Sequence, residues 1–163
     1  MRRTIGCALV AASIAAAQPA FAQFDSLPSG DLDLRMEGLN EKYAMYIEHG
    51  SLATEGSTVW FWALQVIPES IGSYAAWTVQ GMNCATREAA TSEIVGVKPD
   101  GSFYGSGGEA REMGPITPDS MEASLFQVVC EDKSFELGEP AVSTVAAAMD
   151  QGQATLKRRF GVE

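Results

Sequence analysis

The segment that decides the fold class is STVWFWALQVIP at residues 57–68, in which β-branched and aromatic side chains dominate until Pro68 ends the run. Side chains alternate between the two faces of a strand, which puts Trp60 and Trp62 on one face and Phe61 on the other. Both faces are therefore apolar, as they are in a strand that is covered from both sides. We predict a central strand here, in a sheet with packing on each face.

Further strand patterns follow along the chain. Residues 74–84 form an apolar run, residues 88–97 end in apolar side chains, and a return arm begins at residue 102. Between the last two, KPDG at residues 98–101 has the composition of a tight turn. Consecutive strands joined by short turns predict an antiparallel meander.

The three tryptophans of the chain, Trp60, Trp62 and Trp77, all lie in these apolar strands. An exposed set of indole rings would form a platform for a ligand, whereas buried rings would fill the core. Because the surrounding positions are so apolar, we predict that all three are structural core residues.

The segment before the central strand is less clear. Apolar residues within 39–52 fit both strand alternation and helical spacing, and the turns at Gly50 and Gly56 favour a strand for its second half. The preceding residues 23–38 are rich in Asp, Ser, Gly and Pro, which is typical of an extended lead-in. We therefore predict a single domain at residues 39–163.

Two helices are expected in the second half of the chain. The sequence TPDS suits a helix start, with Thr117 as the cap and Pro118 at the first helical position, and the apolar stripe that follows ends near Cys130. A second helix is expected at about residues 140–160, with Gly152 weakening its middle. The predicted fold is α+β, an antiparallel sheet with both helices packed on it.

The first 22 residues have the layout of a secretory signal peptide. Arg2 and Arg3 precede an apolar run, and the small-residue site Ala-Phe-Ala ends at Ala22, so we predict cleavage between Ala22 and Gln23. No later segment approaches the roughly 20 apolar residues of a membrane helix, so no integral membrane segment is expected in the mature chain. We predict an exported protein that is periplasmic or extracellular, with the cell surface as one possible location.

The charge of the chain argues against nucleic acid as a partner. The full sequence has 11 basic and 21 acidic residues, and removing residues 1–22 takes away two arginines and no acid, which leaves a formal charge of −12. Such a surface repels phosphate backbones. A protein partner is the expectation instead.

Signal removal also changes the cysteine count from three to two, Cys84 and Cys130. Disulfides persist outside the cytoplasm, and two cysteines have one possible pairing. The alternatives are a metal pair, which needs more ligands than one histidine supplies, and a redox pair, which usually has C-x-x-C spacing. We predict a structural disulfide between Cys84 and Cys130.

No residue pattern predicts a catalytic, metal-binding or cofactor-binding site. His49, the single histidine, is interpreted as a surface residue beside a turn, although any histidine-based triad would have to centre on it, with Ser51 two residues away. The acids of the second half are attributed to loops and helix starts rather than to a carboxylate pair. GSGGE at residues 105–109 lacks the Lys-Ser/Thr ending of a phosphate loop and is interpreted as a mobile hairpin connection. An enzyme would require a pocket converging on His49 or on two acids.

Between about Tyr43 and Cys130, the pieces VWFWAL, NCATR, GVKPDGSF and PITPDSMEASLFQVVC follow one another in a characteristic order and spacing. Together they resemble the surface-adhesin protein E family of exported bacterial proteins. The resemblance implies an antiparallel sheet with a helix packed on it, held by the Cys84 to Cys130 bond. It also implies a non-enzymatic, adhesin-like role in binding host or matrix proteins. The alternative function is a periplasmic accessory or structural protein of an envelope complex.

Overall fold

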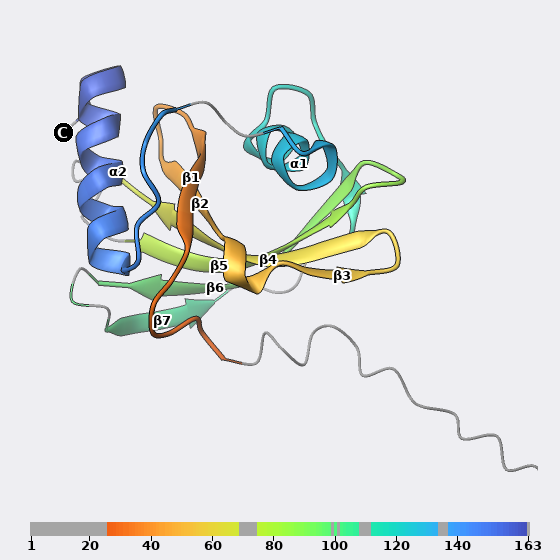
Figure 1. Ribbon diagram of the computed structural model, residues 1–163, viewed down its shortest axis with the longest axis horizontal. Coiled ribbons are helices and arrows are strands. Elements are labelled where there is room, and N and C mark those ends of the chain that lie inside the picture. Colours follow the sequence, from red (N-terminus) through yellow and green to blue (C-terminus); the bar gives the residue numbers. More distant parts are fainter. Residues whose placement is uncertain are drawn as a thin grey trace, which may run out of the picture.

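The predicted central strand is β4 (Thr58–Val66), which lies in the middle of an eight-stranded antiparallel sheet (Figure 1). The computed structural model describes residues 26–68, 75–98, 100, 102–107, 112–133 and 137–162. Along the sheet the strand order is β1-β2-β4-β5-β6-β7. The bounds are β1 (Leu34–Leu39), β2 (Ala44–Glu48), β5 (Ala75–Asn83), β6 (Glu88–Val97) and β7 (Phe103–Gly107).

Two short strands complete the sheet. A 3-10 turn, His49–Ser51, follows β2 and leads into β3 (Ala53–Glu55), which pairs with the start of β4. β8 (Gly114–Pro115) pairs with the first residues of β6. Every pairing is antiparallel, as the meander pattern predicted.

The two helices cover opposite faces of the sheet. Alternate residues of β4 enter different clusters, with Trp60, Trp62, Leu64 and Val66 in one and Phe61 and Ala63 in the other. The first cluster contains Ala148, Met149 and Leu156 of α2 (Val145–Phe160), and the second contains Met121, Leu125 and Phe126 of α1 (Met121–Glu131). The sheet is therefore packed on both faces, and the α+β prediction is confirmed.

The three tryptophans lie in the core, with exposed fractions of 8% for Trp60, 5% for Trp62 and 1% for Trp77. The rings of Trp62 and Trp77 meet edge to face, with their centroids 6.1 Å apart. Trp60 lies directly opposite Gly81 in the register of β4 and β5, and its indole occupies the space that a side chain at Gly81 would need. A side chain at position 81 would therefore clash with this ring.

A disulfide joins Cys84, in the turn after β5, to Cys130 in the last turn of α1, with their Cα atoms 5.4 Å apart. Beside it, the guanidinium of Arg87 lies 4.4 Å from the ring centre of Phe126 and donates a hydrogen bond of 3.0 Å to Glu131. These contacts fix the helix to the end of the β5–β6 hairpin.

The predicted start of the domain needs correction. The predicted lead-in contains most of β1, because Leu34 and Met36 are buried and β1 pairs with β2 from Leu34 to Leu39. The predicted signal peptide and the cleavage site at Ala22 and Gln23 lie outside the described residues.

The helix starts also differ from the prediction. Ser120, not Thr117, caps α1 by accepting a hydrogen bond from the amide of Ala123, because Asp119 has a positive φ of 61° and cannot continue a helix. Thr144 caps α2 in the same way, so this helix begins five residues after Pro140.

Residues 105–107, predicted as a mobile connection, belong to β7. The remainder of that connection, residues 108 and 109, lies outside the described residues. In the part of the chain that the structure describes, no helix has the length and apolar character needed to cross a membrane.

Candidate functional site

A pocket of about 470 Å³ lies between the β1–β2 end of the sheet and the last turn of α1. Its size falls in the range of about 300–1,000 Å³ that is typical of small-ligand sites. One part of its wall is apolar and the other is polar, so the pocket has the mixed lining of a ligand site. The apolar side chains are Ile47, Leu52, Val59, Val128 and Val129, and the polar ones are Arg35, Glu37, His49, Thr54 and Asp132.

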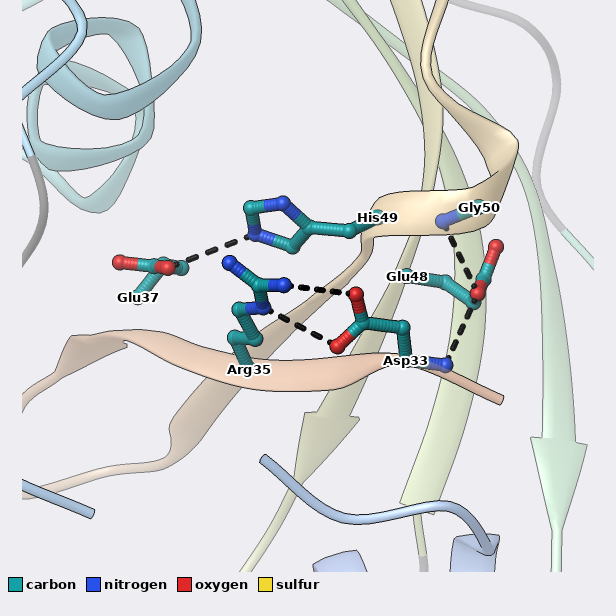
Figure 2. Close-up of polar contacts among 6 residues, drawn as sticks. All are labelled: Asp33, Arg35, Glu37, Glu48, His49 and Gly50. Carbon is teal, nitrogen blue, oxygen red and sulfur yellow. Dashed lines mark hydrogen bonds and ion pairs between the residues drawn. The ribbon is translucent and has the colours of Figure 1, made fainter. Parts of the chain in front are cut away.

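At the polar end, the imidazole of His49 faces the carboxylate of Glu37 (Figure 2). Nε2 of His49 lies 3.4 Å from Oε1 of Glu37, and their side chains are 21% and 8% exposed. Nε2 is enclosed, yet among the described residues it is the one buried side-chain nitrogen or oxygen without a hydrogen-bond partner. The two groups are therefore in contact without a hydrogen bond between them.

Arg35 brings a positive charge to the same pocket, but its charge is largely matched by Asp33. Nε and Nη2 of Arg35 donate hydrogen bonds of 3.0 and 2.8 Å to the two carboxylate oxygens of Asp33. This pair lowers the pKa of Asp33 and raises the pKa of Arg35, in both cases mainly through the side-chain hydrogen bonds. Both side chains are about half exposed, so the pair orients the guanidinium more than it stabilises the fold.

Glu48 is adjacent to His49 in sequence but faces the other way (Figure 2). Its Oε1 accepts hydrogen bonds of 3.1 Å from the amides of Asp33 and Gly50. Glu48 thus ties the start of β1 to the 3-10 turn and does not orient the imidazole. The two adjacent side chains therefore point to different sides.

Ser51, the hydroxyl nearest to His49 in sequence, is committed to the turn. Its Oγ donates a hydrogen bond of 2.7 Å to the carbonyl of Glu48 and accepts one of 2.8 Å from the amide of Trp62. The arrangement is that of a structural turn residue and not of a nucleophile paired with a histidine.

The interpretation of His49 as a surface turn residue is wrong in one respect. The residue does begin the 3-10 turn, but its ring is directed into the pocket. The partners Arg35 and Glu37 were missed because residues 23–38 were interpreted as a lead-in. The alternation of charged Asp33, Arg35 and Glu37 with buried Leu34 and Met36 was the available signal.

A second feature lies at the opposite end of the sheet. Phe103 and Tyr104 of β7 are 57% and 49% exposed, and Ile94 of the neighbouring β6 is 42% exposed. The ring of Tyr104 lies over Gly96, within the space that a side chain there would fill. Large apolar side chains are therefore gathered on the β6–β7 end of the sheet.

The two edges of the sheet differ in how they are covered. At the β1 edge, the amide and carbonyl of Leu34 both bond to Val142, at 3.0 and 2.9 Å, and the amide of Leu32 bonds to the carbonyl of Ser143. At the β7 edge, no described strand pairs with the outer side. β7 is the open edge in the part of the chain that the structure describes.

The acidic residues that the structure describes in the second half do not converge on a metal-binding arrangement. Glu131 binds Arg87 and Lys133, and these hydrogen bonds lower the pKa of Glu131. Glu139 pairs with Arg158 of α2. Over the described ranges, no group of three or more His, Cys, Asp or Glu side chains is placed to hold a metal ion.

No family model matches this chain, and no curated protein matches it. Among solved structures it is similar to Haemophilus influenzae protein E, with a TM-score of 0.42 and 16% identity over 64% of this chain and 96% of that one. A second crystal form of the same protein gives the same TM-score and identity, over 64% of this chain and 98% of that one. Protein E from non-typeable Haemophilus influenzae matches with a TM-score of 0.39 and 16% identity. The match covers 76% of this chain and 99% of that one. Membership of the surface-adhesin protein E family stays a prediction.

Proposed function

We propose that this chain is an exported, non-enzymatic protein-binding module that binds its partner along the outer edge of β7. The observation that carries the proposal is the open edge with exposed Phe103 and Tyr104, beside exposed Ile94. An edge strand presents unpaired amide and carbonyl groups to which an extended segment of another protein can add as a further strand. Neighbouring apolar side chains then supply the contact area and the selectivity.

The contrast with the other edge supports this choice. The segment around Val142 already occupies the β1 edge at Leu34. A partner strand added there would have to displace the three backbone hydrogen bonds that Leu32 and Leu34 make with this segment, whereas no described strand pairs with the outer side of β7. The preferred partner segment is extended, apolar at alternate positions and basic at its flanks, since the chain without residues 1–22 carries a formal charge of −12.

A non-enzymatic role is consistent with the geometry around the single histidine. His49 faces a carboxylate rather than a hydroxyl or thiol, and Ser51 is held in the turn by two hydrogen bonds. The partner can be a host or matrix protein, as adhesion would require, or an envelope protein, as an accessory role in the periplasm would require.

The binding proposal is tested with immobilised matrix and serum proteins, and with bacterial envelope proteins, by measuring the affinity of the wild type and of Phe103→Lys. Phe103→Lys should weaken binding at least about tenfold, because an exposed apolar anchor is lost and a lysine blunts the strand edge. Phe160→Lys is the matched control, since Phe160 is 45% exposed at the end of α2, away from β7. Equal loss in both variants, or in neither, would refute the β7 site.

Location separates the two classes of partner. Protease treatment of intact cells, compared with cells whose outer membrane is permeabilised, reports whether the chain reaches the cell surface. Cleavage on intact cells supports a host or matrix partner. Protection until permeabilisation excludes adhesion and directs the search to envelope proteins.

A further inference from the structure

We propose that the pocket between β1, β2 and the end of α1 binds a small organic cation, a protonated amine attached to an apolar body. The proposal does not depend on the β7 edge, because the two features lie at opposite ends of the sheet. It rests on the lining of the pocket, on its charge and on an unsatisfied nitrogen.

The apolar wall accounts for the body of the ligand. Ile47, Val59, Val128 and Val129 form a surface that excludes water from one side of the pocket, with Leu52 at its margin, 41% exposed. A ring or a short alkyl chain placed against this surface would be removed from water, which favours binding.

The charges of the pocket account for the amine. Glu37 and Asp132 supply two carboxylates, while the one arginine, Arg35, is held by Asp33 through two hydrogen bonds. Asp132 is also the residue that caps the C-terminal end of α1, where the backbone carbonyls leave a partial negative charge. Glu37, Asp132 and the C-terminal end of α1 each favour a cation in the pocket.

His49 explains how the amine is accommodated. Its Nε2 has no hydrogen bond and lies against Glu37 at 3.4 Å, so turning the imidazole aside breaks no hydrogen bond. An ammonium group between the two residues can donate to the carboxylate of Glu37 and, where Nε2 carries no proton, to Nε2 of His49. Buried polar atoms without a hydrogen-bond partner are rare, and an ammonium group would give Nε2 of His49 such a partner.

Other ligand classes fit the same pocket less well. A metal ion is disfavoured because the described residues hold no group of three or more metal-binding side chains. An anion would face the nearly buried charge of Glu37, and Arg35 already has an anionic partner in Asp33.

The test is a titration of the purified, oxidised protein with 2-phenylethylamine, followed by the shifts of backbone amide signals in NMR at physiological salt. The neutral analogue 2-phenylethanol and the anionic analogue 3-phenylpropionate are the matched probes. We expect saturable shifts at His49, Leu52 and residues 128–132 with the amine, and at least tenfold weaker binding of the other two. Binding of the alcohol as tight as that of the amine, preferential binding of the acid, or no saturable shift with the amine would each overturn the proposal.

Variants test which groups act on the amine. Glu37→Gln should weaken amine binding about tenfold or more, as expected for loss of a charge-assisted hydrogen bond, and Asp132→Asn about threefold. Glu48→Gln is the matched control, since it changes another nearly buried carboxylate that faces away from the pocket, and it should change the affinity less than about twofold. If Glu37→Gln fails to fold, the exposed Asp132→Asn variant still carries the test. Equal effects of the Glu48→Gln and Asp132→Asn variants would overturn the proposal.

Discussion

Gly152 of α2 lies so close to Val66 of β4 that a Cβ atom at position 152 would be 3.0 Å from Cγ1 of Val66. The glycine is buried, and the hydroxyl of Tyr46 borders the same space at 3.4 Å. The missing side chain is therefore what allows the helix to approach the sheet. A residue that weakens a helix in isolation stabilises its packing here.

The first prediction concerns this close approach. Gly152→Leu should lower the free energy of unfolding by about 1–3 kcal/mol, because the larger side chain forces α2 away from β4. Ala154→Leu, on the exposed side of the same helix, should change it by less than about 0.5 kcal/mol. Urea unfolding of both variants measures the difference, and equal stability of the two would show that the contact does not hold the helix.

The central strand β4 could be predicted from the sequence, whereas the packing role of Gly152 could not. The apolar alternation of residues 57–68 depends only on local side chains, and it predicted a central strand with both faces covered. The role of Gly152 depends on which strand the helix crosses, and no local pattern contains that information. The low helix propensity of glycine is evident from the sequence, but its contribution to the packing of α2 on β4 is not.

The candidate pocket was missed for a related reason. His49 was recognised as the residue on which any histidine site must centre, but its partner Glu37 lies on a strand formed largely through pairing with β2 and bonds to Val142. The composition of residues 23–38 favoured a lead-in. The strand is stabilised by distant parts of the chain, so its existence could be inferred only from the alternation of charged and apolar residues.

The second prediction concerns alkaline pH. Burial, assisted by the charge of Glu139, raises the pKa of Tyr46 above its ordinary value of 10.0. The unfolded chain therefore loses this proton at a lower pH than the folded chain does, so stability is complete below pH 10 and falls as pH rises above it. The contribution of Tyr46 to this slope approaches about 1.4 kcal/mol for each pH unit.

Tyr46→Phe isolates that contribution. At neutral pH the variant should lose about 1 kcal/mol, because the hydroxyl donates a hydrogen bond of 3.0 Å to Gln151. Above pH 10 its stability should fall less steeply than that of the wild type, and the two curves should converge. Parallel curves from pH 9 to 11, measured by urea unfolding, would contradict the burial of the hydroxyl.

The third prediction concerns Glu48, the buried carboxylate that joins β1 to the 3-10 turn. Glu48→Ala leaves the amides of Asp33 and Gly50 without their acceptor and should cost about 2–4 kcal/mol. Glu48→Gln should cost less than about 1 kcal/mol, since one oxygen accepts both bonds and an amide oxygen can take its place. Similar losses in the two variants would mean that the charge, and not the hydrogen bonds, is what the fold requires.

The last prediction concerns the disulfide between Cys84 and Cys130. It closes a loop with a sequence separation of 46, for which the chain-entropy model gives about 4 kcal/mol of stabilisation through the unfolded state. The bond also joins the β5–β6 hairpin to α1, whose Val128 and Val129 form part of the pocket wall. Replacing both cysteines by serine should therefore lower the stability by about 2–4 kcal/mol and weaken amine binding, because the helix end is less firmly held. A reducing agent should lower the Tm of the wild type to that of the double variant and leave the variant unchanged. Unchanged amine affinity in the double variant would show that the remaining contacts of α1, including Arg87 with Glu131, hold the pocket without the covalent bond.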